Sequence, residues 1–225
     1  MFRKLLSLLP RLWQDELRRF RFIHHARNGN FSPNEPEAGL LSQLVSAGDW
    51  VIDIGANVGQ YTLLLSHLVG PSGRVLAFEP ITATAATLAS VCARCAPWQN
   101  ISVFNLAASG RTGTLSFHLP VDQAGLNNYE RAHAREGGAT SVLATTIDAL
   151  QLPHRISLVK VDAEGHENPV LFGMRETIAR DLPILIVEDN GTDAPEFLSH
   201  LGYRPQKIKD NSPNIVYIAH STERE

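Results

Sequence analysis

From residue 51 onward, short apolar runs alternate with segments of helical periodicity, and this alternation restricts the folds that the chain can adopt. The apolar runs lack a polar residue at every second position, which is typical of parallel strands buried on both faces. Right-handed crossovers between such strands predict a doubly wound α/β fold with a mostly parallel sheet. We expect strands at 51–53, 75–78, 101–104, 158–161, 184–187 and 215–219, and helices at 37–47, 60–69, 82–96, from 168 onward and at 193–202.

The stretch 110–146 interrupts this alternation. Within it, 114–118 and 141–146 have the period of exposed antiparallel strands, and a polar loop at 120–140 separates them. We interpret the stretch as a small β insertion above the edge of the sheet, on the side where a substrate enters. The chain of 225 residues otherwise suits one main domain at 37–225, preceded by a helical extension and linker at 1–36.

The N-terminal extension is basic and amphipathic. Residues 1–27 hold seven basic and two acidic side chains, a charge of +5; the whole chain carries −3, so the remainder carries −8. We expect Pro10 to start a second helical piece as its first residue. The extension either contacts a membrane surface or a partner, or lies on its own domain with solvated arginines. The apolar residues of the stripe are Leu5, Leu8, Leu9, Leu12, Trp13, Leu17 and Phe20.

Charge and cysteine content exclude several classes of protein. The acidic main domain argues against nucleic acid as a partner, because a broad acidic face does not neutralise phosphates. No run of about 18 apolar residues predicts a spanning helix, and the run 5–9 is too short for a signal peptide. The only cysteines, Cys92 and Cys95, make neither a secreted disulfide framework nor a four-ligand zinc site. We therefore expect a cytoplasmic protein, with peripheral membrane contact as an additional prediction.

The segment 51–61 joins a buried strand to a helix through a loop with two glycines. We expect Gly55 to allow close approach of a ligand and Gly59 to let the helix begin tightly against the strand. The spacing differs from the G-x-G-x-x-G of dinucleotide sites, and Asp53 would repel a pyrophosphate placed there. A ligand with an ammonium and a sulfonium group suits Asp53 better, which predicts S-adenosylmethionine.

Glu79 ends the second predicted strand, twenty residues after Gly59. A carboxylate at this position accepts hydrogen bonds from both ribose hydroxyls of a bound nucleoside. Pro80 stiffens the turn that follows, and Ile81 is placed to pack on the adenine ring.

The segment 158–167 contains a second buried strand that ends in acidic residues. Because side chains alternate along a strand, Lys160 and Asp162 share one face and are expected to pair. Asp162, Glu164 and His166 then lie where a methyl acceptor would bind, and the general base is expected to be Glu164 or His166. The alternative is that Glu164 or His166 caps the helix that starts at Asn168.

A divalent metal is a further alternative at this edge of the sheet. Asp162 and Glu188 end neighbouring predicted strands, and with Asn190 they offer the oxygen ligands that Mg²⁺ binds. The same three residues also suit a polar cleft rim without a metal, and we predict no metal ligand.

These two segments together resemble the FkbM family of S-adenosylmethionine-dependent methyltransferases. The resemblance covers about 37–219 and implies a class I methyltransferase fold, with a seven-stranded sheet whose last strand is antiparallel. It implies methyl transfer, usually to a hydroxyl of a sugar or a natural-product scaffold. The residues that match the family pattern are Asp53, Gly55, Asn57, Gly59 and Glu79 in the cofactor loop and Asp162, Glu164, Gly165 and Glu167 in the second motif. With Tyr61, Ile81 and Ala107 added, this gives the cofactor-binding set that we predict.

Two other functions remain open from the sequence. A dehydrogenase or nucleotide enzyme shares the predicted fold, although Asp53 and the glycine spacing argue against it. A non-catalytic module that binds a small molecule or a biosynthetic partner is the alternative from a different class.

Overall fold

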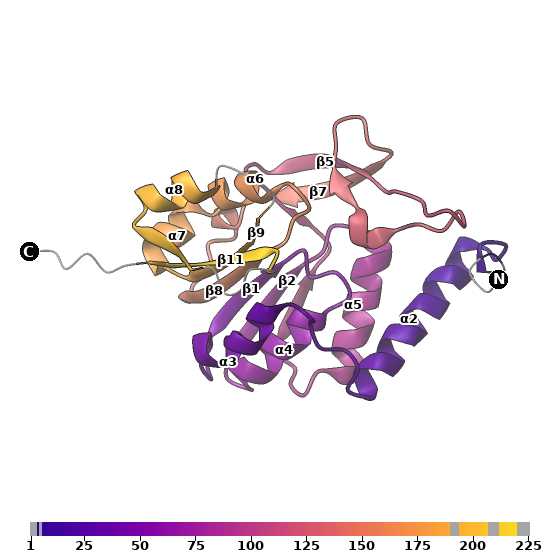
Figure 1. The fold of residues 1–225 in the computed structure, drawn as a ribbon, viewed down its shortest axis with the longest axis horizontal. Helices are drawn as coiled ribbons and strands as arrows, with labels where there is room; N and C mark the ends of the chain where they lie inside the picture. Colours follow the sequence, from indigo (N-terminus) through magenta and orange to yellow (C-terminus); the bar gives the residue numbers. More distant parts are fainter. Residues whose placement is uncertain (1–3, 5, 190–193, 207–211, 220–225) are drawn as a thin grey trace, which may run out of the picture.

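The computed structural model describes residues 4, 6–189, 194–206 and 212–219, and its centre is a seven-stranded sheet (Figure 1). The strand order is β10-β11-β9-β8-β1-β2-β3. The last strand in the chain, β11, is antiparallel to both of its neighbours, and the other pairs are parallel. The strands are β1 (Trp50–Ile54), β2 (Arg74–Phe78), β3 (Ile101–Phe104), β8 (Ile156–Val161), β9 (Ile184–Glu188), β10 (Tyr203–Gln206) and β11 (Asn214–Ala219).

This sheet confirms the predicted doubly wound fold of the class I methyltransferases. The six strands that the sequence predicts for this sheet are present, with ends that differ by at most two residues. The sequence analysis missed β10, because Pro205 and three exposed positions hide its strand pattern. Pro205 is tolerated there since β10 lies at the edge of the sheet and pairs only with β11.

Helices cover both faces of the sheet (Figure 1). On one face α3 (Leu41–Leu44) and α4 (Gln60–Val69) pack on β1 and β2, with α5 (Thr82–Cys95) beside them. On the other face lie α6 (Glu167–Phe172), α7 (Arg175–Asp181) and α8 (Ala194–His200). Neighbouring residues of β1 point to opposite faces of the sheet and pack against different helices. Val51 packs with Leu65 of α4, and Ile52 packs with Met174 and Ile178. Burial on both faces explains the continuous apolar runs.

Two predicted helices differ from the structure. The region 37–47 forms a 3₁₀ turn, η1 (Pro36–Leu40), followed by the single turn of α3, which ends where Val45 is extended. The helix expected from 168 onward starts earlier, at Glu167, and is divided into α6 and α7 at Gly173. A Cβ at Gly173 would lie 2.0 Å from the carbonyl oxygen of Ser109, so this break lets the Ser109 loop approach closely.

The predicted insertion forms a second sheet of four strands with the order β4-β7-β5-β6. Its strands are β4 (Ala107–Ala108), β5 (Gly113–His118), β6 (His133–Ala134) and β7 (Thr140–Thr145), and β5 and β7 pair antiparallel as predicted. The 3₁₀ turn η2 (Tyr129–Arg131) precedes β6. Phe117, Val142 and Ala144 pack against Ile81 of the main domain, so the small sheet rests on the loop after β2.

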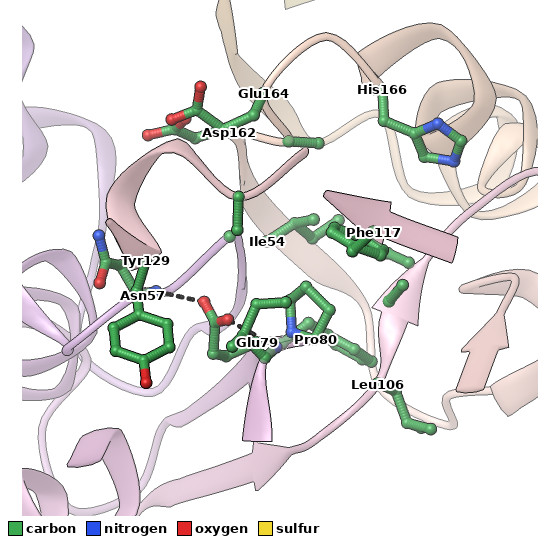
Figure 2. A pocket seen from close by; sticks show the side chains of 17 residues that line it. Ile54, Asn57, Glu79, Pro80, Leu106, Phe117, Tyr129, Asp162, Glu164 and His166 are labelled. Carbon is green, nitrogen blue, oxygen red and sulfur yellow. Dashed lines mark hydrogen bonds between the residues drawn. The ribbon is translucent and has the colours of Figure 1, made fainter. Parts of the chain in front are cut away.

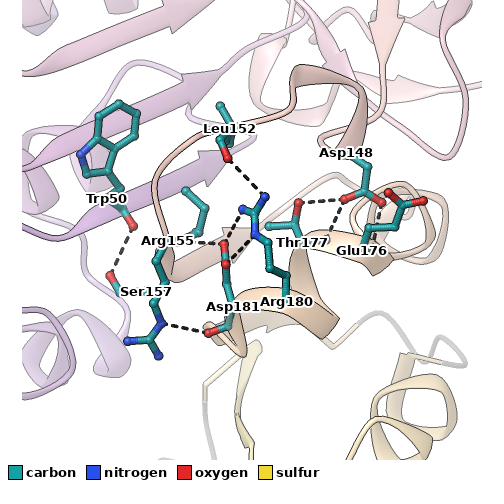
Figure 3. A network of polar contacts seen from close by, with 10 residues as sticks. Trp50, Asp148, Leu152, Arg155, Ser157, Glu176, Thr177, Arg180 and Asp181 are labelled. Carbon is teal, nitrogen blue, oxygen red and sulfur yellow. Dashed lines mark hydrogen bonds and ion pairs between the residues drawn. The ribbon is translucent and has the colours of Figure 1, made fainter.

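A polar network fixes the start of β8 and the helix α7 (Figure 3). Asp148, in the 3₁₀ turn η3 (Asp148–Leu150), accepts hydrogen bonds from the backbone N–H groups of Glu176 and Thr177 at 3.0 and 2.9 Å. At the other end of α7, Asp181 accepts the backbone N–H of Ile156 at 2.9 Å. Asp148 thus holds the start of α7 and Asp181 holds the start of β8, and the opposite end of β8 carries the second motif.

The N-terminal extension forms α2 (Arg11–Arg27), which lies along α5 (Figure 1). Pro10 is the residue before the helix rather than its first residue. Cys92 and Cys95 are free thiols on α5, and the Cys95 Sγ contacts the backbone oxygen of Ile23 at 3.9 Å. Among the described residues, none of the helices has the length and apolar character needed to span a bilayer.

Candidate functional site

A cavity lies at the carboxyl ends of β1, β2 and β8 (Figure 2). It encloses about 680 Å³ of space free of protein atoms, part of it open to solvent. This is the edge at which doubly wound sheets bind ligands. Of the residues predicted from sequence, those that line the cavity are Gly55, Asn57, Glu79, Ile81, Ala107, Asp162, Glu164 and His166.

The two glycines of the loop after β1 are required by the protein's own packing. Gly55 has φ +76°, and a Cβ there would lie 1.7 Å from the carbonyl oxygen of Asp162. The loop after β8 therefore approaches Gly55 closely, and Gly55 also lines the cavity, so the expected approach of a ligand there stays a prediction. Gly59 has φ +102° directly before α4, and its Cβ would lie 2.7 Å from Leu88 of α5. Gly59 thus lets α4 start against α5 rather than against the strand.

Glu79 stands on the cavity wall and is 6% exposed. Its Oε2 accepts the backbone N–H of Asn57 at 3.0 Å and its Oε1 accepts that of Ile81 at 2.8 Å. Burial raises the pKa of Glu79 to about 7, against the lowering effect of the two backbone hydrogen bonds. Each carboxylate oxygen keeps a lone pair for a further donor, such as a ribose hydroxyl.

Asn57 supplies a second polar group at the same wall. It has φ +48°, and its buried Oδ1 has no hydrogen-bond partner within the described residues. This oxygen is shielded from solvent, so it is the backbone N–H of Asn57, bonded to Glu79, that contributes to this wall. Other lining residues are apolar and include Ile81, Leu106 and Phe117. A lining with both polar and apolar side chains fits a nucleoside, with its ribose near Glu79 and its base near Ile81.

Asp53 and Tyr61 lie outside the cavity, although the sequence analysis placed both at the cofactor. Asp53 is fully buried and accepts the hydroxyl of Thr62 at 2.6 Å, on the side of the sheet that α4 covers. Burial raises its pKa, and the neighbouring Lys160 opposes this effect. The Tyr61 hydroxyl donates to the buried carboxylate of Glu37 at 2.9 Å. The alternation of β1 directs Asp53 toward α4, and Tyr61, in the first turn of α4, points toward Glu37.

The predicted pair of Lys160 and Asp162 is present, with Nζ and Oδ2 separated by 2.7 Å. The Lys160 side chain is buried and lies next to Asp53 in the strand register, and its Nζ is 4.5 Å from the centre of the Tyr61 ring. One buried cation is thus shared by two carboxylates and an aromatic ring. This cluster holds the start of the loop that follows β8, where Asp162 lines the cavity.

Glu164 and His166 lie on the same loop but point in different directions (Figure 2). The carboxylates of Glu164 and Asp162 are directed to one side and the His166 ring to the other. Glu164 is exposed at the rim with φ +51°. Partial desolvation and the nearby carboxylates of Glu188 and Asp162 raise its pKa to about 7. Both Glu164 and His166 are therefore able to take up a proton near neutral pH.

His166 joins the main cavity to a second one. Its Nε2 is 3.0 Å from the Ser109 hydroxyl, and partial burial lowers its pKa from the ordinary 6.5. The second cavity also borders His166 and has an apolar wall that includes Leu115, Phe172 and Phe197. A neutral imidazole thus stands between a cavity suited to a nucleoside and a cavity suited to an apolar group.

The helix-capping alternative for these residues is wrong. His166 occupies the position before α6 but makes no side-chain capping hydrogen bond. Glu167 orders the loop instead, because its Oε1 accepts the backbone N–H groups of Ala163 and Gly165 at 3.0 and 3.1 Å. Glu164 and His166 therefore keep their side chains available at the cavity.

The suggested metal site is not tested as a whole, because Asn190 lies outside the described residues. Across the ranges that the structure describes, no three His, Cys, Asp or Glu side chains are grouped as a metal site requires.

Sequence reasoning missed Ser109, Phe117 and Tyr129 as site residues. Ser109 comes directly after β4 and five residues after β3. A polar residue just after a strand could have been predicted to lie at the carboxyl edge of the sheet. Phe117 and Tyr129 lie in the insertion, where no local pattern shows which side chains face the cavity. The fold of the small sheet decides that placement.

Comparisons with known proteins identify the family and the fold. A family model described as the methyltransferase FkbM domain matches residues 53–205. The methyltransferase FkbM from Methylobacillus flagellatus KT superposes with a TM-score of 0.58 at 18% identity, over 84% of this chain and 49% of that one. This chain thus spans about half the length of that protein. No curated protein matches the chain.

Two further structures have TM-scores of 0.50. A putative rRNA-methylase from Clostridium thermocellum is 13% identical over 80% of this chain and 90% of that one. Precorrin-6y C5,15-methyltransferase from Geobacter metallireducens GS-15 is 15% identical over 82% of this chain and 86% of that one. At such identities the likeness concerns the fold alone. The family match covers most of the chain and both site motifs, and the chain belongs to the FkbM family of S-adenosylmethionine-dependent methyltransferases.

Proposed function

We propose that this methyltransferase binds S-adenosylmethionine in the main cavity and methylates a hydroxyl of a sugar or a natural-product scaffold. The observation that carries the proposal is the position of His166, which borders both the nucleoside-shaped cavity and the apolar cavity beside it. A base at this junction reaches an acceptor that enters from the second cavity.

The cofactor would be held by residues that line the cavity. Glu79 would accept the ribose hydroxyls, and Ile81 with Ala107 would contact the adenine. When bound, S-adenosylmethionine supplies a methyl group on a positively charged sulfur. The carboxylates of Asp162 and Glu164 would place negative charge near that sulfonium.

The acceptor would be deprotonated by His166 as the methyl group is transferred. A neutral imidazole has one ring nitrogen with a free lone pair, and the lowered pKa keeps His166 neutral at pH 7. The hydrogen bond to Ser109 fixes the ring orientation. Much of the rate would come from positioning, because transfer requires the oxygen close to the methyl group and in line with it.

The second cavity suggests the acceptor's chemistry. Phe172 and Phe197 provide flat apolar surface for the ring of a sugar or of a natural-product scaffold, and Arg111 also lines this cavity. We expect a cytoplasmic enzyme, and the nucleic-acid class of acceptor is disfavoured by the charge of −8 outside the extension.

Titration calorimetry with S-adenosylmethionine, S-adenosylhomocysteine and NAD⁺, each with and without Mg²⁺, tests the cofactor assignment. Binding of the first two at about micromolar Kd would support the proposal, and binding of NAD⁺ alone would favour a dehydrogenase. Dependence on Mg²⁺ would assign Asp162 and Glu188 as metal ligands. Binding without turnover across glycan and natural-product alcohols would favour a non-catalytic module.

A further inference from the structure

The helix α2 packs on the main domain through its polar face. Asp15 accepts the hydroxyl of Tyr129 at 2.9 Å, and the Arg18 guanidinium lies 4.7 Å from the centre of the same ring. Arg19 approaches Ser90 of α5 at 3.4 Å. Apolar contact with the domain is confined to the C-terminal half, where Ile23 is buried with Phe31 and Val91. The arginines predicted to be solvated therefore include two that face the domain.

The apolar stripe of the same helix faces away from the domain. Trp13, Leu17 and Phe20 are spaced by four and three residues, so they lie on one side of the helix. Their exposed fractions are 65%, 45% and 67%, and Leu9, which precedes the helix, is 39% exposed. Figure 1 shows α2 at the edge of the molecule, with α5 along its inner side. A stripe of this kind on the surface marks an interaction site rather than a domain core.

The charge around the stripe specifies the kind of partner. Arg11, Arg21 and Arg27 are exposed on α2, and residues 1–27 carry +5 while the rest of the chain carries −8. Basic residues beside Trp, Phe and Leu are typical of helices that lie in the interface of an anionic bilayer. A contact between two copies of this face is disfavoured, because it would bring together two segments that each carry +5 and repel each other. Four side chains also bury far less than the roughly 800 Å² per partner of a stable dimer.

We propose that the outward face of α2 docks on a lipid bilayer that contains anionic headgroups. Trp13 and Phe20 enter the headgroup boundary, and the exposed arginines bind the lipid phosphates. Because Asp15 and Arg18 hold Tyr129 at the rim of the cofactor cavity, docking places that cavity close to the membrane surface. The substrate would then be presented at the bilayer.

Sedimentation of the full chain with vesicles tests the proposal. We expect binding to phosphatidylglycerol-containing vesicles, weak binding to pure phosphatidylcholine vesicles, and loss of binding at high salt. Trp13→Ala combined with Phe20→Ala should lower the bound fraction about tenfold or more, because two inserted side chains are lost. The control Trp98→Ala removes a tryptophan that is exposed elsewhere, at 42%, and should bind as the unchanged chain does.

Trp13 fluorescence gives a second measurement. Anionic vesicles should shift the tryptophan emission to the blue, and Trp13→Phe should abolish the shift while sedimentation persists. Three results would overturn the proposal: absence of pelleting in a chain shown to be folded, equal pelleting with neutral vesicles, or a dimer in light scattering that Phe20→Ser dissociates.

Discussion

At the scale of single residues, Glu79 is the side chain whose contacts argue most directly for cofactor binding. It is buried at the cavity wall, and both of its oxygens already order the neighbouring loops. A ligand that donates two hydroxyl hydrogen bonds would complete its coordination.

We expect Glu79→Ala to weaken S-adenosylmethionine binding by about 3 kcal/mol, roughly a hundredfold in Kd, since hydrogen bonds to a charged group are lost. Calorimetry measures the change, with Glu136→Ala as an exposed control outside the cavity. Unchanged affinity in a folded variant would remove Glu79 from the cofactor site.

The two candidate bases predict different pH profiles. A base is active when unprotonated, so kcat/KM rises as the pH increases through its pKa. With His166 as the base, the rise lies below pH 6.5, because burial lowers its pKa. With Glu164 as the base, the rise lies at about pH 7, because desolvation and the neighbouring carboxylates raise its pKa.

Substitution separates these alternatives. We expect His166→Asn to lower kcat by about a hundredfold or more with cofactor affinity retained, and Glu164→Gln to have the smaller effect. The reverse order, with a profile centred near pH 7 in His166→Asn, would assign the base to Glu164.

At the scale of elements, α7 depends on a cap from outside its own sequence. Asp148 accepts the N–H groups of Glu176 and Thr177 and also the Thr177 hydroxyl at 2.8 Å. Asp148→Ala should lower the free energy of unfolding by about 1–2 kcal/mol, as loss of an N-terminal cap does. Denaturant unfolding measures this, and Glu176→Ala, which keeps its backbone N–H, should change little. If Asp148→Ala is as stable as the unchanged chain, water replaces the hydrogen bonds of the cap.

The break between α6 and α7 is a second feature at this scale. Gly173 lets the Ser109 carbonyl approach, and Ser109 in turn contacts His166. The helix boundary therefore contributes to the site, since a continuous helix with a side chain at 173 would push the Ser109 loop away.

At the scale of the whole molecule, α2 is attached to the main domain through a small apolar cluster. Ile23 is 7% exposed and packs with Phe31, Val58 and Val91. Ile23→Ala should lower the free energy of unfolding by about 2–3 kcal/mol, because it leaves a cavity in that cluster. The exposed Leu12→Ala on the same helix is the control and should leave stability within about 0.5 kcal/mol. If both variants match the unchanged chain, α2 does not contribute to the folded domain.

How much of the molecule could be predicted depends on the kind of information that each feature needs. Strand and helix order followed from periodicity, because burial on both faces leaves continuous apolar runs. The pair Lys160–Asp162 followed from the two-residue alternation of a strand. The edge strand β10 escaped prediction, since one exposed face and Pro205 remove the signal.

By itself, the sequence determined the doubly wound fold, the loop at the end of β1, Glu79 and the acidic loop after β8, because these depend on short-range patterns. Only the tertiary structure decided that Asp53 faces α4 and Tyr61 faces Glu37, that Gly55 accommodates Asp162, that Ser109 meets His166, and that α2 presents its apolar side to solvent. The physical reason is the same in each case. A pattern along the chain shows which side of an element is apolar or charged, whereas the surface that this side meets is set by segments distant in sequence.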